Sequence, residues 1–209
     1  MYDNEYLFFN SLKGFRGPDD DGSGRFDPRE LNVKNEQLTT LTIITDSKEI
    51  HLHEELQKFN GQFIEHLSEP KINCCSLHWM EIEPEEPAST YHDNLLGMGD
   101  KTLLIFDWKR FFEILDNSLE SQGLQYSRRK VTYYDPKTYS GEMTLHHKDH
   151  KLSWQNEYRV LIAPTQNKPI RVNLPGLKEI SHVVETINLP KLRIKFAPTS
   201  DNDGSVDIK

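Results

Sequence analysis

The chain has 209 residues, enough for one sizeable hydrophobic core, and it carries a formal net charge of -8. Non-specific nucleic-acid binding is therefore unfavourable, because a nucleic-acid backbone repels an acidic protein. The sequence contains no run of about 18 apolar residues, and its first five residues are acidic where a signal peptide is basic. We therefore expect a cytoplasmic protein that does not associate with membranes.

In the first half of the chain, apolar runs alternate with turn-forming segments. Runs rich in aromatic and β-branched residues predict strands at 5–12, 38–45 and 71–77. The segment 13–27, rich in glycine and aspartate, predicts a loop. Within 54–67 the apolar residues recur at steps of three and four, which predicts an amphipathic helix.

The second half of the chain predicts one long helix and several strands. Asp107 is placed to cap the start of the helix, and Gly123 marks its end. Apolar and β-branched runs predict the strands, and a proline-glycine pair leads into a further short helix. The strands are predicted at 101–106, 130–134, 158–163, 170–173 and 192–196, and the short helix at 177–181.

This order of elements is neither a repeating βαβ pattern nor all-β, so it predicts an α+β fold. We expect a mixed, mostly antiparallel sheet with two or three helices packed on it. The region 1–196 is interpreted as a single domain. The last residues, 197–209, are rich in Asp, Asn, Gly and Ser, which is typical of a disordered tail.

An acidic loop near the N-terminus aligns with the twelve-residue calcium loop of an EF-hand. In that alignment the side chains of Asp19, Asp21, Ser23, Asp27 and Glu30 are the calcium ligands. Glycines and a proline before the loop would break the incoming helix of an EF-hand. The alternative is an acidic surface loop that binds no metal.

A second set of polar residues lies at the start of an apolar run. Gln155 and Glu157 share one face if 154–162 is a strand, so their amide and carboxylate project together. Such a pair can bind a ribose hydroxyl and stabilise a sugar cation. The alternative is structural: Glu157 forms an ion pair in the core, and Arg159, on the same face, has the best reach.

The cysteines and histidines predict no separate active site. Cys74 and Cys75 are adjacent small core residues, and a strand places His78 on the face opposite Cys75. A zinc site would need four well-placed ligands. For the histidine-rich stretch 146–151 we therefore favour a solvated charged loop.

Several segments, taken together, resemble a family of uncharacterised bacterial and phage proteins that is defined only as a domain of unknown function. The resemblance covers about 6 to 195, nearly the whole chain. It implies no established activity. It is carried by FFNSLKGFRG, RFDPRE, INCCS, GDKTLLIFDWKRFFEIL, VTYYD, Lys151 ahead of WQNEYRVLI, and LPGLKEIS.

The same segments are similar, more distantly, to the ADP-ribosyltransferase superfamily. In that superfamily a core-strand serine and a late Gln/Glu-x-Glu element surround the nicotinamide ribose of NAD, and here Ser76 and Gln155-x-Glu157 match them. The resemblance implies that Glu157 stabilises the ribosyl cation and that Gln155 orients the acceptor. The Arg or His expected on the first strand is absent, which leaves Arg16 or Arg25 to hold the pyrophosphate.

Two functional hypotheses follow from these observations. The first is an NAD-dependent, ADP-ribosyltransferase-like protein of bacterial or phage origin, with catalytic Glu157, Gln155 and Ser76. The second is a non-enzymatic interaction protein, an inhibitor or accessory factor of a phage or mobile element, that binds an unknown basic protein through an acidic surface. The acidic stretches 19–21 and 81–86 would form that surface.

Overall fold

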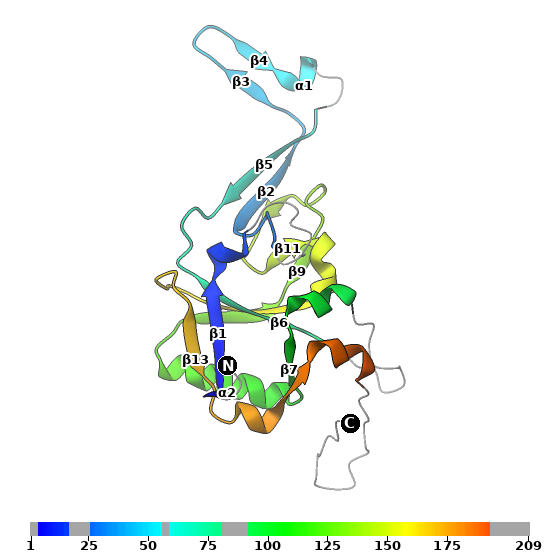
Figure 1. Ribbon diagram of the computed structural model, residues 1–209. Helices are drawn as coiled ribbons and strands as arrows, with labels where there is room; N and C mark the ends of the chain where they lie inside the picture. Colours follow the sequence, from blue (N-terminus) through cyan, green and yellow to red (C-terminus); the bar gives the residue numbers. More distant parts are fainter. Residues whose placement is uncertain (1–3, 17–25, 56–58, 81–91, 193–209) are drawn as a thin grey trace.

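A computed structural model of the chain describes residues 4–16, 26–55, 59–80 and 92–192 (Figure 1). Its helices are α1 (Leu52–Glu55), α2 (Trp108–Ser121) and short 3₁₀ helices at Leu12–Phe15, Asp93–Met98, His150–Gln155, Leu177–Ile180 and Thr186–Lys191. Its strands are β1 (Tyr6–Ser11), β2 (Asn32–Leu38), β3 (Thr42–Ile44), β4 (Glu49–His51), β5 (Gly61–His66), β6 (Asn73–His78), β7 (Lys101–Ile105), β8 (Tyr126–Lys130), β9 (Thr132–Tyr134), β10 (Gly141–Glu142), β11 (His147–Asp149), β12 (Glu157–Ile162), β13 (Ile170–Asn173) and β14 (Ser181–Glu185). The predicted α+β class is confirmed.

The largest sheet has the strand order β13-β1-β6-β12-β8, and all of its neighbouring strands are antiparallel. β12 lies between β6 and β8, as its apolar run predicts. The expected central strand over 154–162 begins only at Glu157, because a 3₁₀ helix precedes it and Asn156 has a left-handed backbone.

The two faces of this sheet differ in chemistry because side chains alternate along each strand. On one face Val160 and Ile162 of β12 pack with Cys75 of β6 in the main hydrophobic core. The opposite face of β12 carries the buried charged side chains of Glu157 and Arg159. We call this side of the sheet its polar face.

Helix α2 covers the apolar face. The Asp107 side chain accepts a hydrogen bond from the backbone N–H of Arg110 at 2.9 Å, which caps the first turn as predicted. The helix ends before Gly123, whose φ of +67° is available to glycine at little cost. Its buried residues are Phe111, Phe112, Ile114, Leu115 and Leu119.

The polar face is covered by the turn that precedes β2 and by the short parallel pair of β9 and β11. The predicted strand over 130–134 covers only the last residue of β8, then Val131, then β9, so most of β8 was not predicted. The change of direction at Val131 lets β8 pair with β12 while β9 pairs with β11.

An arm projects from the side of the sheet opposite α2 (Figure 1). Its stem is formed by β2, β5 and β10, and β3, β4 and α1 form its far end. The arm exposes the large apolar side chains of Ile43, Ile44, Phe63 and Ile64.

Two predictions for the arm region are wrong. The helix expected over 54–67 is instead the end of α1 followed by β5, and residues 56–58 lie outside the described part of the chain. Phe63 and Ile64 face solvent on β5, so their spacing does not mark the buried side of a helix. The strand expected over 38–45 is divided between the end of β2 and β3.

Five other predicted elements agree with the structure, whereas the strands β4, β10, β11 and β14 were not predicted. The first strand, the strand at 71–77, β7, β13 and the short helix near Leu177 all lie where the sequence predicts them, within two residues. The predicted edge strand over 192–196 and the predicted tail lie outside the described residues, apart from Leu192. In the described part of the chain, every helix is too short or too polar to cross a membrane.

Candidate functional site

The candidate site lies on the polar face of the central sheet, where β6 and β12 run side by side. In their antiparallel register Ser76 pairs with Arg159, and His78 pairs with Glu157. Directly paired residues project to the same face of a sheet. The register therefore places the serine and the glutamate, which are 81 positions apart in the chain, on one surface.

Glu157 lies at the centre of a set of short polar contacts. Its Oε1 accepts hydrogen bonds from the Ser76 hydroxyl at 2.6 Å and from Arg159 Nε at 2.7 Å. Its Oε2 accepts from Lys148 Nζ at 2.8 Å. The same ammonium donates to Gln155 Oε1 at 2.6 Å, so Lys148 joins the two predicted residues.

Arg159 continues these contacts to a second carboxylate. Its Nη1 and Nη2 donate to the two oxygens of Glu30 at 2.7 and 3.1 Å, a bidentate pair. The buried ion network, as we define it, consists of Glu30, Lys148, Gln155, Glu157 and Arg159. Its two carboxylates balance its two cations, which is the arrangement that buried charges require.

The network is closed to solvent. Glu157 is 4% exposed and Arg159 is 1% exposed. Burial opposes the charge of Glu157, but the nearby cations Arg159 and Lys148 outweigh burial and lower the pKa of this carboxyl to about 2. Burial likewise opposes the charge of Arg159, yet Glu30 and Glu157 hold its pKa well above its ordinary value. Glu157 is therefore an anion at neutral pH.

Ser76 contacts the buried ion network from the solvent side. Ser76 is exposed, whereas the Glu157 carboxylate that accepts its hydrogen bond is buried. An ionised carboxylate offers about four lone-pair positions on its two oxygens. Oε1 of Glu157 accepts two hydrogen bonds and Oε2 accepts one, so Oε2 can accept one more.

The structure thus brings Ser76, Gln155 and Glu157 together: Gln155 and Glu157 belong to the buried ion network, and exposed Ser76 donates a hydrogen bond to it. Arg16 is exposed at the end of the 3₁₀ helix Leu12–Phe15, and no contact joins it to Glu157 within the described residues. Arg25 lies outside the described residues.

The predicted calcium ligands are described only in part. Asp19, Asp21 and Ser23 lie outside the described residues. Asp27 is buried and accepts a hydrogen bond from the backbone N–H of Arg29 at 2.8 Å, and both oxygens of Glu30 bind Arg159. Among the residues that the structure describes, no three His, Cys, Asp or Glu side chains are grouped as metal ligands would be. Calcium binding stays a prediction.

The structure corrects one prediction and adds residues that the sequence analysis missed. The stretch 146–151 is not a solvated loop, because His146, Lys148 and Asp149 are all buried. Lys148 and Glu30 were not recognised as partners of Glu157 and Arg159, since their contacts depend on pairings across the fold. The sequence carries only one hint, a lysine within a histidine-rich stretch that becomes the short strand β11.

The cysteines are core residues in the structure. Cys74 and Cys75 are buried on opposite faces of β6, and both are free thiols. Burial raises the pKa of each thiol to about 12, so neither is a thiolate at neutral pH.

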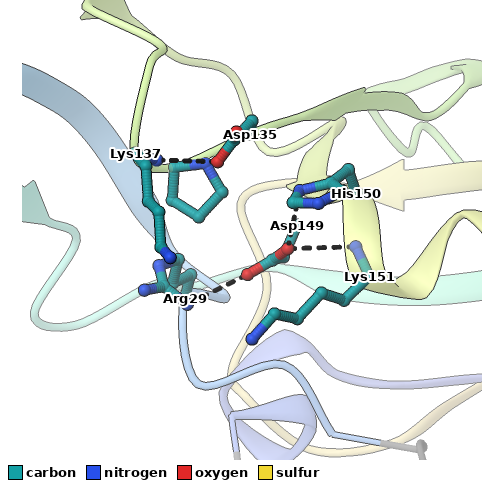
Figure 2. A pocket seen from close by; sticks show the side chains of 7 residues that line it. Arg29, Asp135, Lys137, Asp149, His150 and Lys151 are labelled. Atoms are coloured by element: carbon teal, nitrogen blue, oxygen red, sulfur yellow. Dashed lines mark hydrogen bonds and ion pairs between the residues drawn. The ribbon is translucent and has the colours of Figure 1, made fainter.

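A pocket of about 190 Å³ lies near two chain segments that also supply the buried ion network (Figure 2). Arg29 and Asp149 form an ion pair in it, with Nη1 to Oδ2 at 3.0 Å. Glu30, which follows Arg29, and Lys148, which precedes Asp149, both belong to the buried ion network. The pocket and the network therefore share two chain segments. The pocket is lined by Arg29, Asp135, Pro136, Lys137, Asp149, His150 and Lys151.

Comparison with protein-family models, with curated proteins and with solved structures gives no match to this chain.

Proposed function

We propose that this protein is ADP-ribosyltransferase-like and uses NAD, with Glu157 as the anion that stabilises the ribosyl cation. The observation that carries the proposal is the 2.6 Å hydrogen bond from Ser76 to Glu157. It joins the serine and the glutamate that the resemblance assigns to one ribose site, although they are far apart in sequence.

The charge state of Glu157 suits this chemistry. In the proposed reaction the bond between C1′ of the ribose and the nicotinamide nitrogen breaks, and nicotinamide leaves with the electron pair. Water or an acceptor hydroxyl then attacks C1′ and releases a proton. The carboxylate must be ionised to stabilise the intermediate positive charge, and a pKa of about 2 keeps Glu157 ionised at neutral pH.

The order of strands also supports the proposal. β1, β6 and β12 are consecutive in the central sheet, so the first strand, the serine strand and the glutamate strand are neighbours. Under the proposal Gln155 orients the acceptor, and Arg16 or Arg25 holds the pyrophosphate. The remaining acceptor position on Glu157 Oε2 is the one that a ribose hydroxyl would use.

Access to Glu157 is the main structural requirement of this function. Because Glu157 is 4% exposed, NAD has to approach along the side on which Ser76 is exposed. Ser76 is then a positioning residue for Glu157. Loss of a hydrogen bond to a charged group costs about 1.5–3 kcal/mol, which corresponds to a roughly 10- to 150-fold lower rate if the bond acts in the transition state.

The test is NAD turnover by three forms of the protein. We expect the wild type to release nicotinamide, Ser76→Ala to reduce kcat by at least about tenfold with little change in KM, and the exposed-serine control Ser68→Ala to match the wild type. Ser76→Ala is preferred to a change at Glu157, which would also unbalance the network. A wild type that neither binds NAD in calorimetry nor releases nicotinamide overturns the proposal, as does full activity of Ser76→Ala.

The arm favours a second function, that of a non-enzymatic interaction protein. Its described part carries exposed Asp46, Glu49, Glu54 and Glu65 beside the exposed apolar residues of β3 and β5. This composition suits a basic protein surface with an apolar centre. The stretches 19–21 and 81–86, which were expected to form the acidic surface, lie outside the described residues.

The arm hypothesis is tested with Ile44→Asp, since Ile44 is 78% exposed. This variant keeps the stability of the wild type but loses binding to a basic partner protein. A loss of stability greater than about 1 kcal/mol would instead show that Ile44 is packed in the folded protein.

A further inference from the structure

The pocket lined by Arg29 and Asp149 differs in chemistry from the buried ion network. We propose that it binds the phosphate group of a small molecule. The proposal does not depend on NAD chemistry at Glu157, because none of the pocket residues contacts the Glu157 carboxylate in the described part of the chain.

Three cationic side chains, Arg29, Lys137 and Lys151, line this pocket. Lys137 and Lys151 are exposed, and neither ammonium has an ion-pair partner among the described residues. Figure 2 shows their side chains reaching toward Arg29 from different sides of the pocket. Arg29 lines the pocket, and its Nε, which is buried, finds no acceptor within the described residues. Buried donors almost always have a partner, so an acceptor supplied by a ligand would complete this group.

The two carboxylates of the pocket are already engaged. Asp149 accepts hydrogen bonds from Arg29 and from the backbone N–H of Lys151, and its Oδ1 lies 3.3 Å from His150 Nδ1. Asp135 Oδ1 accepts from the backbone N–H of Lys137 at 2.9 Å. Three cations and two carboxylates line the pocket, so its lining carries one more positive than negative charge in a chain whose net charge is -8. An anion is the ligand that this imbalance favours.

The number of donors and the size of the pocket narrow the class of anion. A guanidinium and two ammonium groups provide more donors than one carboxylate commonly uses, and they match the three oxygens of a phosphate group. A volume of about 190 Å³ is below the roughly 300–1,000 Å³ of pockets that enclose whole drug-sized ligands. The pocket therefore holds the phosphate group while the rest of the molecule extends into solvent.

The position of the pocket links it to the buried ion network. Arg29 lines the pocket while Glu30 binds Arg159, and Asp149 lines the pocket while Lys148 binds Glu157. A bound phosphate would hold both shared segments in place, and it would stabilise the folded protein by mass action.

The test is calorimetric titration of the full chain with inorganic phosphate and with AMP at constant ionic strength. The pocket variant is the double substitution Lys137→Ala/Lys151→Ala, because both lysines are exposed and lie outside the buried ion network. The matched control is Lys71→Ala/Lys168→Ala, which removes the same charge from two exposed lysines that do not line the pocket.

We expect the wild type and the control to bind, and Kd for the pocket variant to rise at least tenfold. Tighter binding of AMP than of phosphate would identify a phosphate monoester as the ligand, and equal binding would identify free phosphate. Absence of binding by the wild type overturns the proposal. So does an equal loss of affinity in both double variants, because general electrostatics would then explain the binding. A wild type that binds phosphate but leaves NAD intact supports the pocket while refuting the proposed function.

Discussion

Replacing Glu157 by Gln tests the buried ion network directly, because it removes one charge and keeps the shape of the side chain. In the wild type Glu157 and Glu30 balance Lys148 and Arg159. After the change Arg159 keeps its bidentate partner Glu30, but Lys148 keeps only its contact with Gln155. The variant therefore contains a buried cation without an anion.

The pKa of Glu157 sets the size of the effect. Its shift from 4.5 to about 2, at about 1.4 kcal/mol per pKa unit, means that the network favours the charged carboxylate by about 3 kcal/mol. Breaking a buried ion pair by removing one partner commonly costs about 3–5 kcal/mol. We therefore expect Glu157→Gln to lower the free energy of unfolding by about 3 kcal/mol.

Urea denaturation at pH 7 measures this change, and a second substitution provides the control. Adding Lys148→Met removes the unpaired ammonium, so the double variant Glu157→Gln/Lys148→Met should recover a large part of the loss. A single variant within about 1 kcal/mol of the wild type would refute the argument. A double variant that is less stable than the single one would show that Lys148 is not the source of the cost.

Three further predictions concern acid, calcium and the long helix. Burial lowers the pKa of His146 to about 4. As the pH falls from 6.5 to 4 the unfolded chain therefore binds the proton first, and the free energy of unfolding falls by about 3 kcal/mol. Urea denaturation across this range should show a weaker dependence of that free energy on pH for His146→Gln, and an unchanged dependence contradicts the assignment. If 19–30 binds calcium, the wild type melts at a higher temperature with calcium than with chelator and Asp19→Asn loses most of that difference, whereas identical melting curves end the hypothesis. Loss of the cap in Asp107→Ala should cost about 1 kcal/mol in urea denaturation, and no loss would show that the hydrogen bond to Arg110 does not stabilise α2.

The parts of the fold that depend on residues close together in the sequence could be predicted. Helix α2 has a capping aspartate before it, a glycine after it and an apolar side, and each of these signals is local. The apolar run of β12 likewise identified a central strand. Of the two settings that the sequence left open for Glu157, the structure shows the ion pair with Arg159 in the core.

Contacts between distant segments could not be predicted in the same way. Glu30 and Arg159 are 129 positions apart, and no local pattern links them. Lys148 lies in a stretch whose composition is typical of a solvated loop, yet the pairing of β11 with β9 buries it. In the arm, β5 forms because it pairs with β2, and this pairing overrides the helical spacing of its apolar residues.

The charge and the role of Glu157 can be tested together by carbon-13 NMR of its side-chain carboxyl, with Glu157→Gln used for assignment. We expect the Glu157 carboxyl to titrate with a midpoint near 2, and its chemical shift to change when saturating NAD is added at pH 7. A midpoint near the ordinary value of 4.5 would contradict the buried ion network. A chemical shift that NAD leaves unchanged would contradict the assignment of Glu157 to the ribose site.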